Sequence, residues 1–136
     1  MFPIYVYRIA IARWHMHTVC ELPSFRRDAE DAGMSAGEID DLIEFLSFSP
    51  MAGDEIAGTG GCRKVRVAGR GKGKSGGYRT ITFFTGSNIP LFLVTVFSKG
   101  EKANLSKADR NFLADLTRVL VEESRKKVVR LGKAAP

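Results

Sequence analysis

The chain has 136 residues, which is the length of a single domain. Its 44% apolar and 26% charged residues are ordinary for a globular protein, and no apolar run is long enough for a membrane-spanning helix. Cys20 and Cys62 are too few for a disulfide scaffold or a zinc ribbon, and the two histidines, His15 and His17, lie close to the N-terminus. The sequence therefore argues against a histidine-centred metal site and a Ser/His/Asp triad.

Charge is segregated along the chain. Residues 21–55 contain ten acidic residues and two arginines, whereas residues 56–100 contain eight basic residues and no acidic one. A basic stretch of this length without acids indicates a polyanionic partner such as a nucleic acid. The acidic block before it is expected on a surface that faces away from that partner.

Residues 1–12 are apolar, with Arg8 in the middle of the run. They lack the order of a secretory signal, in which basic residues precede an unbroken apolar stretch and a small-residue cleavage site. Two interpretations stay open. Either Met16 is the natural start and residues 1–15 are a dispensable extension, or residues 4–11 form an extra strand.

The expected order of elements is strand, helix, helix, strand, strand, strand and helix. Ser24 is expected to cap the first helix, and Ser35 opens a capping box for the second. Ser106 and Asp109 are the matching pair for the last helix. Apolar residues at helical spacing predict its core face. That face consists of Phe112, Leu113, Leu116, Val119 and Leu120.

These elements predict an α+β domain with a small antiparallel sheet and helices packed on one face. The last three strands form a meander, and the almost wholly apolar strand at residues 91–98 should be covered on both faces. The domain is expected over residues 16–124. A basic tail at residues 125–136 follows and is expected to fray.

The glycine-rich segment at residues 68–77 is predicted to be a loop between two strands. It is similar to a nucleotide-binding P-loop, but Ala68 replaces the first glycine and a strand follows where a helix is needed. The loop is either a solvated hairpin connection or a clamp on a nucleic-acid backbone. In the second case its glycines let N–H groups approach phosphates, and Arg70, Lys72 and Lys74 supply counter-charge.

Arg79 follows this loop in phase with apolar Ile81 and Phe83, so it should lie at the rim of the sheet or line a concave face. It either pairs with a helix carboxylate or binds a phosphate during phosphoryl transfer. Tyr78 either packs on the loop or stacks on a base. Lys99, after the apolar strand, is either an ordinary turn residue or a general base among other cations.

Four segments together resemble one family. They are residues 58–61, 63–66, 71–79 and 97–106, and the resemblance covers residues 17–122. The chain resembles the RelE/ParE superfamily of type II toxin–antitoxin toxins, in its HigB-like branch. This resemblance implies a RelE-like fold and a ribosome-dependent endoribonuclease that cleaves mRNA in the A site. No metal or cofactor is expected, because the substrate's 2′-OH attacks the adjacent phosphate.

The resemblance also implies roles for individual residues. Arg79 is expected to stabilise the phosphate, with Lys74 and Lys99 in proton transfer or charge stabilisation. The expected RNA-binding residues are Arg63, Lys64, Arg66, Arg70, Lys72, Tyr78 and Lys102.

The implied partners are the ribosome, mRNA and an antitoxin with a helix-turn-helix DNA-binding domain. A cytoplasmic location without membrane contact follows. The alternatives are a non-catalytic toxin or binding module that blocks gyrase or the ribosome, and a plain RNA-binding protein. Fold similarity alone does not separate these targets.

Overall fold

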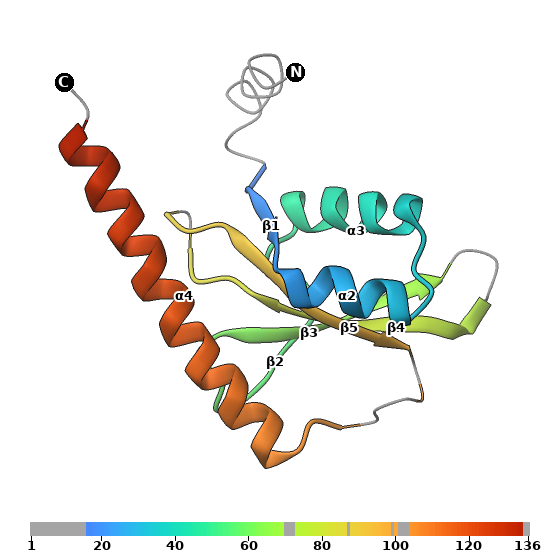
Figure 1. Cartoon of the computed structure of the whole chain (residues 1–136). Helices are drawn as coiled ribbons and strands as arrows, with labels where there is room; N and C mark the ends of the chain where they lie inside the picture. The colour runs from blue at the N-terminus through green and yellow to red at the C-terminus, as the bar shows by residue number, and fades with distance from the viewer. Residues whose placement is uncertain (1–15, 70–72, 87, 99, 101–103, 135–136) are drawn as a thin grey trace.

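The computed structural model describes residues 16–69, 73–86, 88–98, 100 and 104–134. Both interpretations of residues 1–15 therefore concern a segment outside the described residues. The chain has an α+β fold, as predicted, in which a sheet lies between helices (Figure 1). The elements are β1 (Val19–Glu21), α2 (Pro23–Asp31), α3 (Ala36–Phe48), β2 (Asp54–Glu55), β3 (Cys62–Gly69), β4 (Gly73–Phe83), β5 (Leu91–Ser98) and α4 (Lys107–Ala134).

The sheet has five strands in the order β1-β5-β4-β3-β2. The predicted antiparallel meander of β3, β4 and β5 is confirmed. However, β1 pairs with β5 in parallel, with Val19 opposite Leu91, so the expectation of a wholly antiparallel sheet is wrong. Local patterns do not reveal this pairing, because it joins strands far apart in the chain. The sequence also gave no indication of β2, which is two exposed acidic residues long.

The β3–β4 hairpin is longer than predicted, because β4 begins at Gly73 and Gly69 lies opposite it. Most of the segment predicted as a loop is therefore strand. Gly77 shows why this pairing requires glycine. A Cβ atom at this position would lie 2.5 Å from the Val67 carbonyl oxygen, which is too close. The glycines thus permit close approach of two backbones as well as a turn.

Helices cover both faces of the sheet, so the prediction that they share one face is wrong (Figure 1). Phe25 of α2 and Leu46 of α3 belong to one buried cluster with Leu93 of β5. Leu113 of α4 belongs to a second cluster with Phe83 of β4. The central strands carry apolar side chains on both faces, and each face requires its own cover.

The helix ends follow the predicted capping boxes. The Ser35 amide donates to Glu38 Oε1 at 2.8 Å, and the Glu38 amide donates to Ser35 Oγ at 3.1 Å. Ser106 and Asp109 make the same reciprocal pair at 2.9 and 3.1 Å. Ser24 is not a cap. Proline occupies the first turn of α2, and the Ser24 hydroxyl donates to the Val94 carbonyl of β5 at 2.7 Å.

Helix α4 differs from its predicted form in two ways. Phe112 and Val119 are 64% and 55% exposed, whereas Leu113 is buried, so two of the five expected core residues are not part of the buried core. Leu113, Leu116 and Leu120 do pack in the cluster beneath the helix. The Thr117 hydroxyl adds a polar contact, because it donates to the Thr59 carbonyl at 3.0 Å. The backbone stays helical through Ala134, so the tail expected to fray continues the helix.

Candidate nucleic-acid interface

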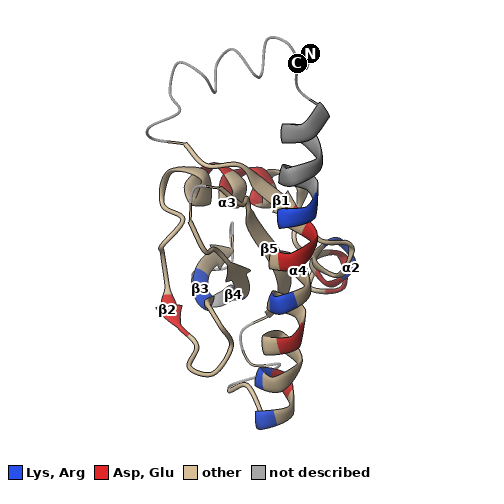
Figure 2. Ribbon diagram, turned by 90° about the vertical axis from the view of Figure 1, so that its left-hand side faces the viewer, with Lys and Arg blue, Asp and Glu red and all other residues tan. Residues whose placement is uncertain are grey.

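Three basic residues lie on the face of the sheet that α4 covers. Arg66 of β3 is the direct partner of Arg79 on β4, and Lys64 is the partner of Ile81. Directly opposed residues of antiparallel strands project to the same face. Ile81 lies in the buried cluster beneath α4, so Lys64, Arg66 and Arg79 project to that side of the sheet. We call these three residues the cationic row; basic residues on β3 are visible in Figure 2.

Phe97 on β5 lies next to the cationic row, because it is the cross-strand partner of Arg79. The register between β4 and β5 shifts at this point: Ile81 pairs with Thr95, whereas the next residue pairs with Leu93. The intervening Val94 is therefore the extra residue of a β-bulge. The bulge places Thr95 and Phe97 on the same face as Arg79.

Within the part of the chain that the structure describes, the charges of the cationic row are not compensated. Arg66 is exposed, and Lys64 and Arg79 are half-buried. Among the described residues, no carboxylate lies within ion-pair distance of any of the three. The alternative in which Arg79 pairs with a helix acid is thus not seen in the described part of the chain. Clustered cations without partners create a positive potential that attracts anions.

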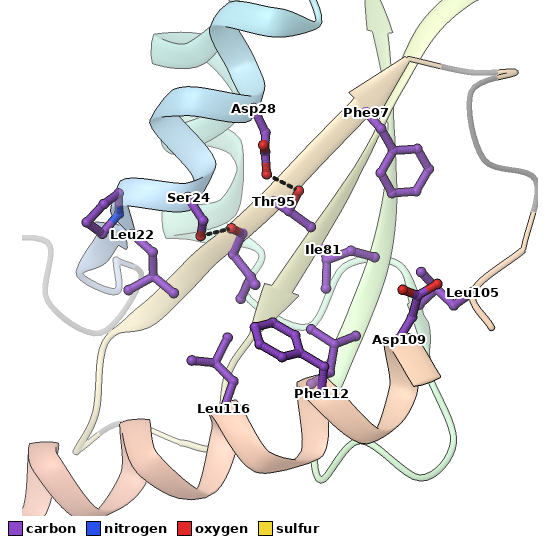
Figure 3. A pocket seen from close by; sticks show the side chains of 13 residues that line it. Leu22, Ser24, Asp28, Ile81, Thr95, Phe97, Leu105, Asp109, Phe112 and Leu116 are labelled. Carbon is purple, nitrogen blue, oxygen red and sulfur yellow. Dashed lines mark hydrogen bonds between the residues drawn. The ribbon is translucent and has the colours of Figure 1, made fainter. Parts of the chain in front are cut away.

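An apolar groove of about 420 Å³ adjoins the row, between α2, β5 and the start of α4 (Figure 3). Phe97, Phe112 and Leu116 line it, so Phe97 contributes to both features. Two carboxylates lie at its border. Asp28 accepts a hydrogen bond from the Thr95 hydroxyl at 2.5 Å, and Asp109 belongs to the α4 cap. The site therefore combines an electropositive strip with an apolar recess.

Tyr78 is not available to stack on a base, so that prediction is wrong. Its side chain is fully buried in the cluster beneath α2 and α3. Its hydroxyl lies 3.2 Å from Glu38 Oε1 and 3.3 Å from the Gly33 carbonyl oxygen. The strand alternates, so Tyr78 and its neighbour Arg79 project to opposite faces. Tyr78 is a core residue that holds α3 to the sheet.

Arg63 is also separated from the cationic row. It pairs in register with Thr82, on the face opposite to Lys64. Its Nη1 donates to the Gly53 carbonyl oxygen at 2.9 Å. Arg63 thus contacts the connection that leads into the edge strand β2. The structure does not bring it together with the other predicted RNA-binding residues that it describes.

The remaining predicted residues are not placed by the structure. Lys74 lies on β4, and only its backbone is described. The others lie outside the described residues; they are Arg70, Lys72, Lys99 and Lys102.

Phe97 was missed as a site residue, because unbroken alternation along β5 would place it on the other face from Phe92 and Val94. Its position opposite Arg79 depends on the bulge at Val94, which the sequence pattern does not indicate. Among the described residues, no group of three or more His, Cys, Asp or Glu side chains is arranged to bind a metal ion. In the same part of the chain, no helix is sufficiently long and apolar to cross a membrane.

A mixed sheet flanked by helices, with an electropositive strip on one face, fits the toxin of a toxin–antitoxin system. Residues 25–135 match the family described as the RelE toxin of the RelE/RelB toxin–antitoxin system. The match covers most of the chain, and the chain belongs to this family. The family implies an antitoxin partner. Assignment to the HigB-like branch stays a prediction from the sequence motifs.

Proposed function

We propose that this toxin is a ribosome-dependent endoribonuclease that cleaves mRNA, and that the cationic row holds the RNA backbone at the cleaved phosphate. The observation that carries the proposal is the register of Arg66 opposite Arg79, with no carboxylate among the described residues paired to either. A folded protein seldom keeps two opposed like charges without benefit, because such pairs are destabilising. A bound phosphodiester would compensate both.

Arg79 is proposed to stabilise the reacting phosphate. The 2′-oxygen of the RNA forms a bond to phosphorus while the bond from phosphorus to the 5′-oxygen breaks, which leaves a cyclic phosphate and a 5′-hydroxyl. Negative charge increases on the phosphate oxygens along this path, and a planar guanidinium donates two hydrogen bonds to such oxygens. Donors placed for the developing charge lower the barrier more than they improve binding.

The other cations are proposed to bind and to move protons. Lys64 and Arg66 would contact phosphates beside the cleaved one, as would Arg70, Lys72 and Lys102. One group must accept the 2′-hydroxyl proton and another must protonate the leaving 5′-oxygen. Lys74 and Lys99 are the proposed candidates, from the family resemblance.

The proposed cellular setting follows from this substrate. The protein would act in the cytoplasm, on mRNA in the A site of the ribosome. An antitoxin with a helix-turn-helix domain would neutralise it. The apolar groove beside the cationic row gives a partner a place to bury apolar side chains near the RNA site.

Primer extension tests the proposal. A defined mRNA is incubated with the antitoxin-free protein, either alone or bound to purified ribosomes. We expect cuts only in the ribosome-bound mRNA. Folded protein that arrests translation without cutting would overturn the nuclease proposal and support a toxin that blocks its target. Equal cutting of free mRNA would show that cleavage does not require the ribosome.

A further inference from the structure

An exposed apolar patch lies on α3, which packs on the opposite side of the sheet from the cationic row. Phe45 and Phe48 are 50% and 51% exposed, and Met51, just beyond the helix end, is 58% exposed. Residues three apart on a helix are surface neighbours, so the two rings lie side by side. We call Phe45, Phe48 and Met51 the α3 patch. Neither the fold nor the proposed RNA site requires these side chains to be exposed.

Acidic residues extend from the α3 patch along the helix. Asp40, Glu44 and Phe48 follow one another at four-residue spacing, which places them in one row. Both acids are exposed, and Figure 2 shows acidic residues on α3. A segment that covers this surface should therefore be apolar and basic.

The N-terminal part of the chain enters the fold beside this patch. The His17 amide donates to the Ser47 carbonyl oxygen, between the two exposed phenylalanines in sequence, at 2.7 Å. The His17 ring packs edge-on against Phe84, with centroids 5.2 Å apart. The described chain is thus held at the C-terminal end of α3 by His17, and the preceding segment is joined to it there. Tethering of this kind gives an effective concentration on the order of millimolar.

The composition of residues 1–15 complements the α3 patch and the acidic residues beside it. They are predominantly aromatic and aliphatic, carry Arg8 and Arg13, and contain no acidic residue. Fifteen extended residues reach roughly 50 Å, whereas a helix of the length of α3 spans only about 20 Å, so length does not limit contact.

We propose that residues 1–15 dock on the α3 patch, with apolar side chains over the exposed rings and Arg8 or Arg13 against Asp40 and Glu44. This makes the segment an integral cover of α3 and not a dispensable extension. The proposal is independent of the nuclease function, because the patch lies on the other side of the sheet.

Hydrogen exchange of the full chain and of a variant that begins at Met16 tests this proposal. We expect the C-terminal turn of α3 to exchange faster by roughly fivefold or more in the shortened variant. Fluorescence of a dye that binds exposed apolar surface should rise in the same variant. Exchange in α4 should be unchanged, which shows that the fold is intact. Unchanged exchange in α3 together with unchanged dye binding would overturn the proposal.

Two matched variants of the full chain localise the contact. The double variant Phe45→Ser and Phe48→Ser should increase exchange within residues 1–15. Phe112→Ser removes an exposed ring on α4 and should leave that exchange unchanged. If Phe112→Ser alone increases exchange within residues 1–15, the segment binds in the apolar groove, and the proposal is overturned. Dimerisation of the full chain that the double variant abolishes would assign the patch to a second copy and also overturn it.

Discussion

Arg66 and Arg79 lie directly opposite each other on β3 and β4, and the described residues include no carboxylate paired with either. Opposed like charges on a sheet destabilise it by roughly 0.2–1 kcal/mol. We therefore expect the pair to lower the stability of the free protein. A bound phosphate backbone would turn this repulsion into a net attraction. Replacement of either arginine should therefore raise the stability of the free protein and lower its affinity for RNA.

The first prediction concerns Arg66→Thr. Removal of one charge should raise the free energy of unfolding by up to about 1 kcal/mol, because threonine also suits an exposed strand position. RNA affinity should fall, and the slope of log affinity against log salt should decrease by about 0.7. Urea unfolding and RNA titrations at several salt concentrations measure both. Arg27→Ala, at an exposed position on α2, is the control and should leave the salt slope unchanged. Loss of stability without loss of RNA affinity would make Arg66 a structural residue.

The second prediction concerns Tyr78→Phe. The hydroxyl lies near Glu38 Oε1 and the Gly33 carbonyl oxygen, so its loss should cost about 1–2 kcal/mol of stability. The ring remains to fill the core, and RNA affinity should not change. Thermal unfolding and RNA titration measure the two effects. A variant of native stability with weakened RNA binding would show that Tyr78 touches the RNA after all.

The third prediction concerns Gly77→Ala. A Cβ atom would lie 2.5 Å from the Val67 carbonyl oxygen, so β3 and β4 must separate locally. We expect a loss of about 1–3 kcal/mol, comparable to other overpacked sites. RNA binding should also weaken, because the same hairpin carries Arg66 and Arg79. Urea unfolding measures the loss. Unchanged stability would show that the hairpin accommodates a side chain without strain.

The fourth prediction concerns Cys62. Burial raises the pKa of its thiol from 9.0 to about 11, and the hydrogen bond with Thr59 opposes this shift. Above pH 9 the unfolded chain releases the thiol proton while the folded chain keeps it, so stability falls as pH rises toward 11. The slope should approach 1.4 kcal/mol per pH unit at most. The difference in unfolding free energy between the native chain and Cys62→Ala should therefore shrink between pH 8 and pH 10. A constant difference would contradict the raised pKa.

Much of the fold was predictable because the patterns that specify it are local. The capping boxes at Ser35 and Ser106 and the alternation of Val65 with Lys64 all concern neighbouring residues. The parallel pairing of β1 and the second helix layer were not predictable. They depend on contacts between distant segments and on which face each helix covers.

The candidate site was predictable in part for the same reason. The phase of Arg79 with Ile81 follows from strand alternation, and the structure retains it. Alternation also separates Tyr78 from Arg79 and Arg63 from Lys64, yet the predictions grouped them as neighbours in sequence. The contribution of Phe97 depends on the bulge at Val94, which no short pattern indicates.

The central claim is that Arg79 stabilises the phosphate during cleavage. Single-turnover cleavage of ribosome-bound mRNA tests it most directly, with the native chain, Arg79→Ala and the control Arg27→Ala. Removal of one stabilising donor typically lowers the rate by about 10²–10³-fold. We expect that loss for Arg79→Ala, with hydrogen exchange in the sheet no faster than in the native chain, and a native rate for Arg27→Ala. Cleavage by Arg79→Ala at the native rate would contradict the account.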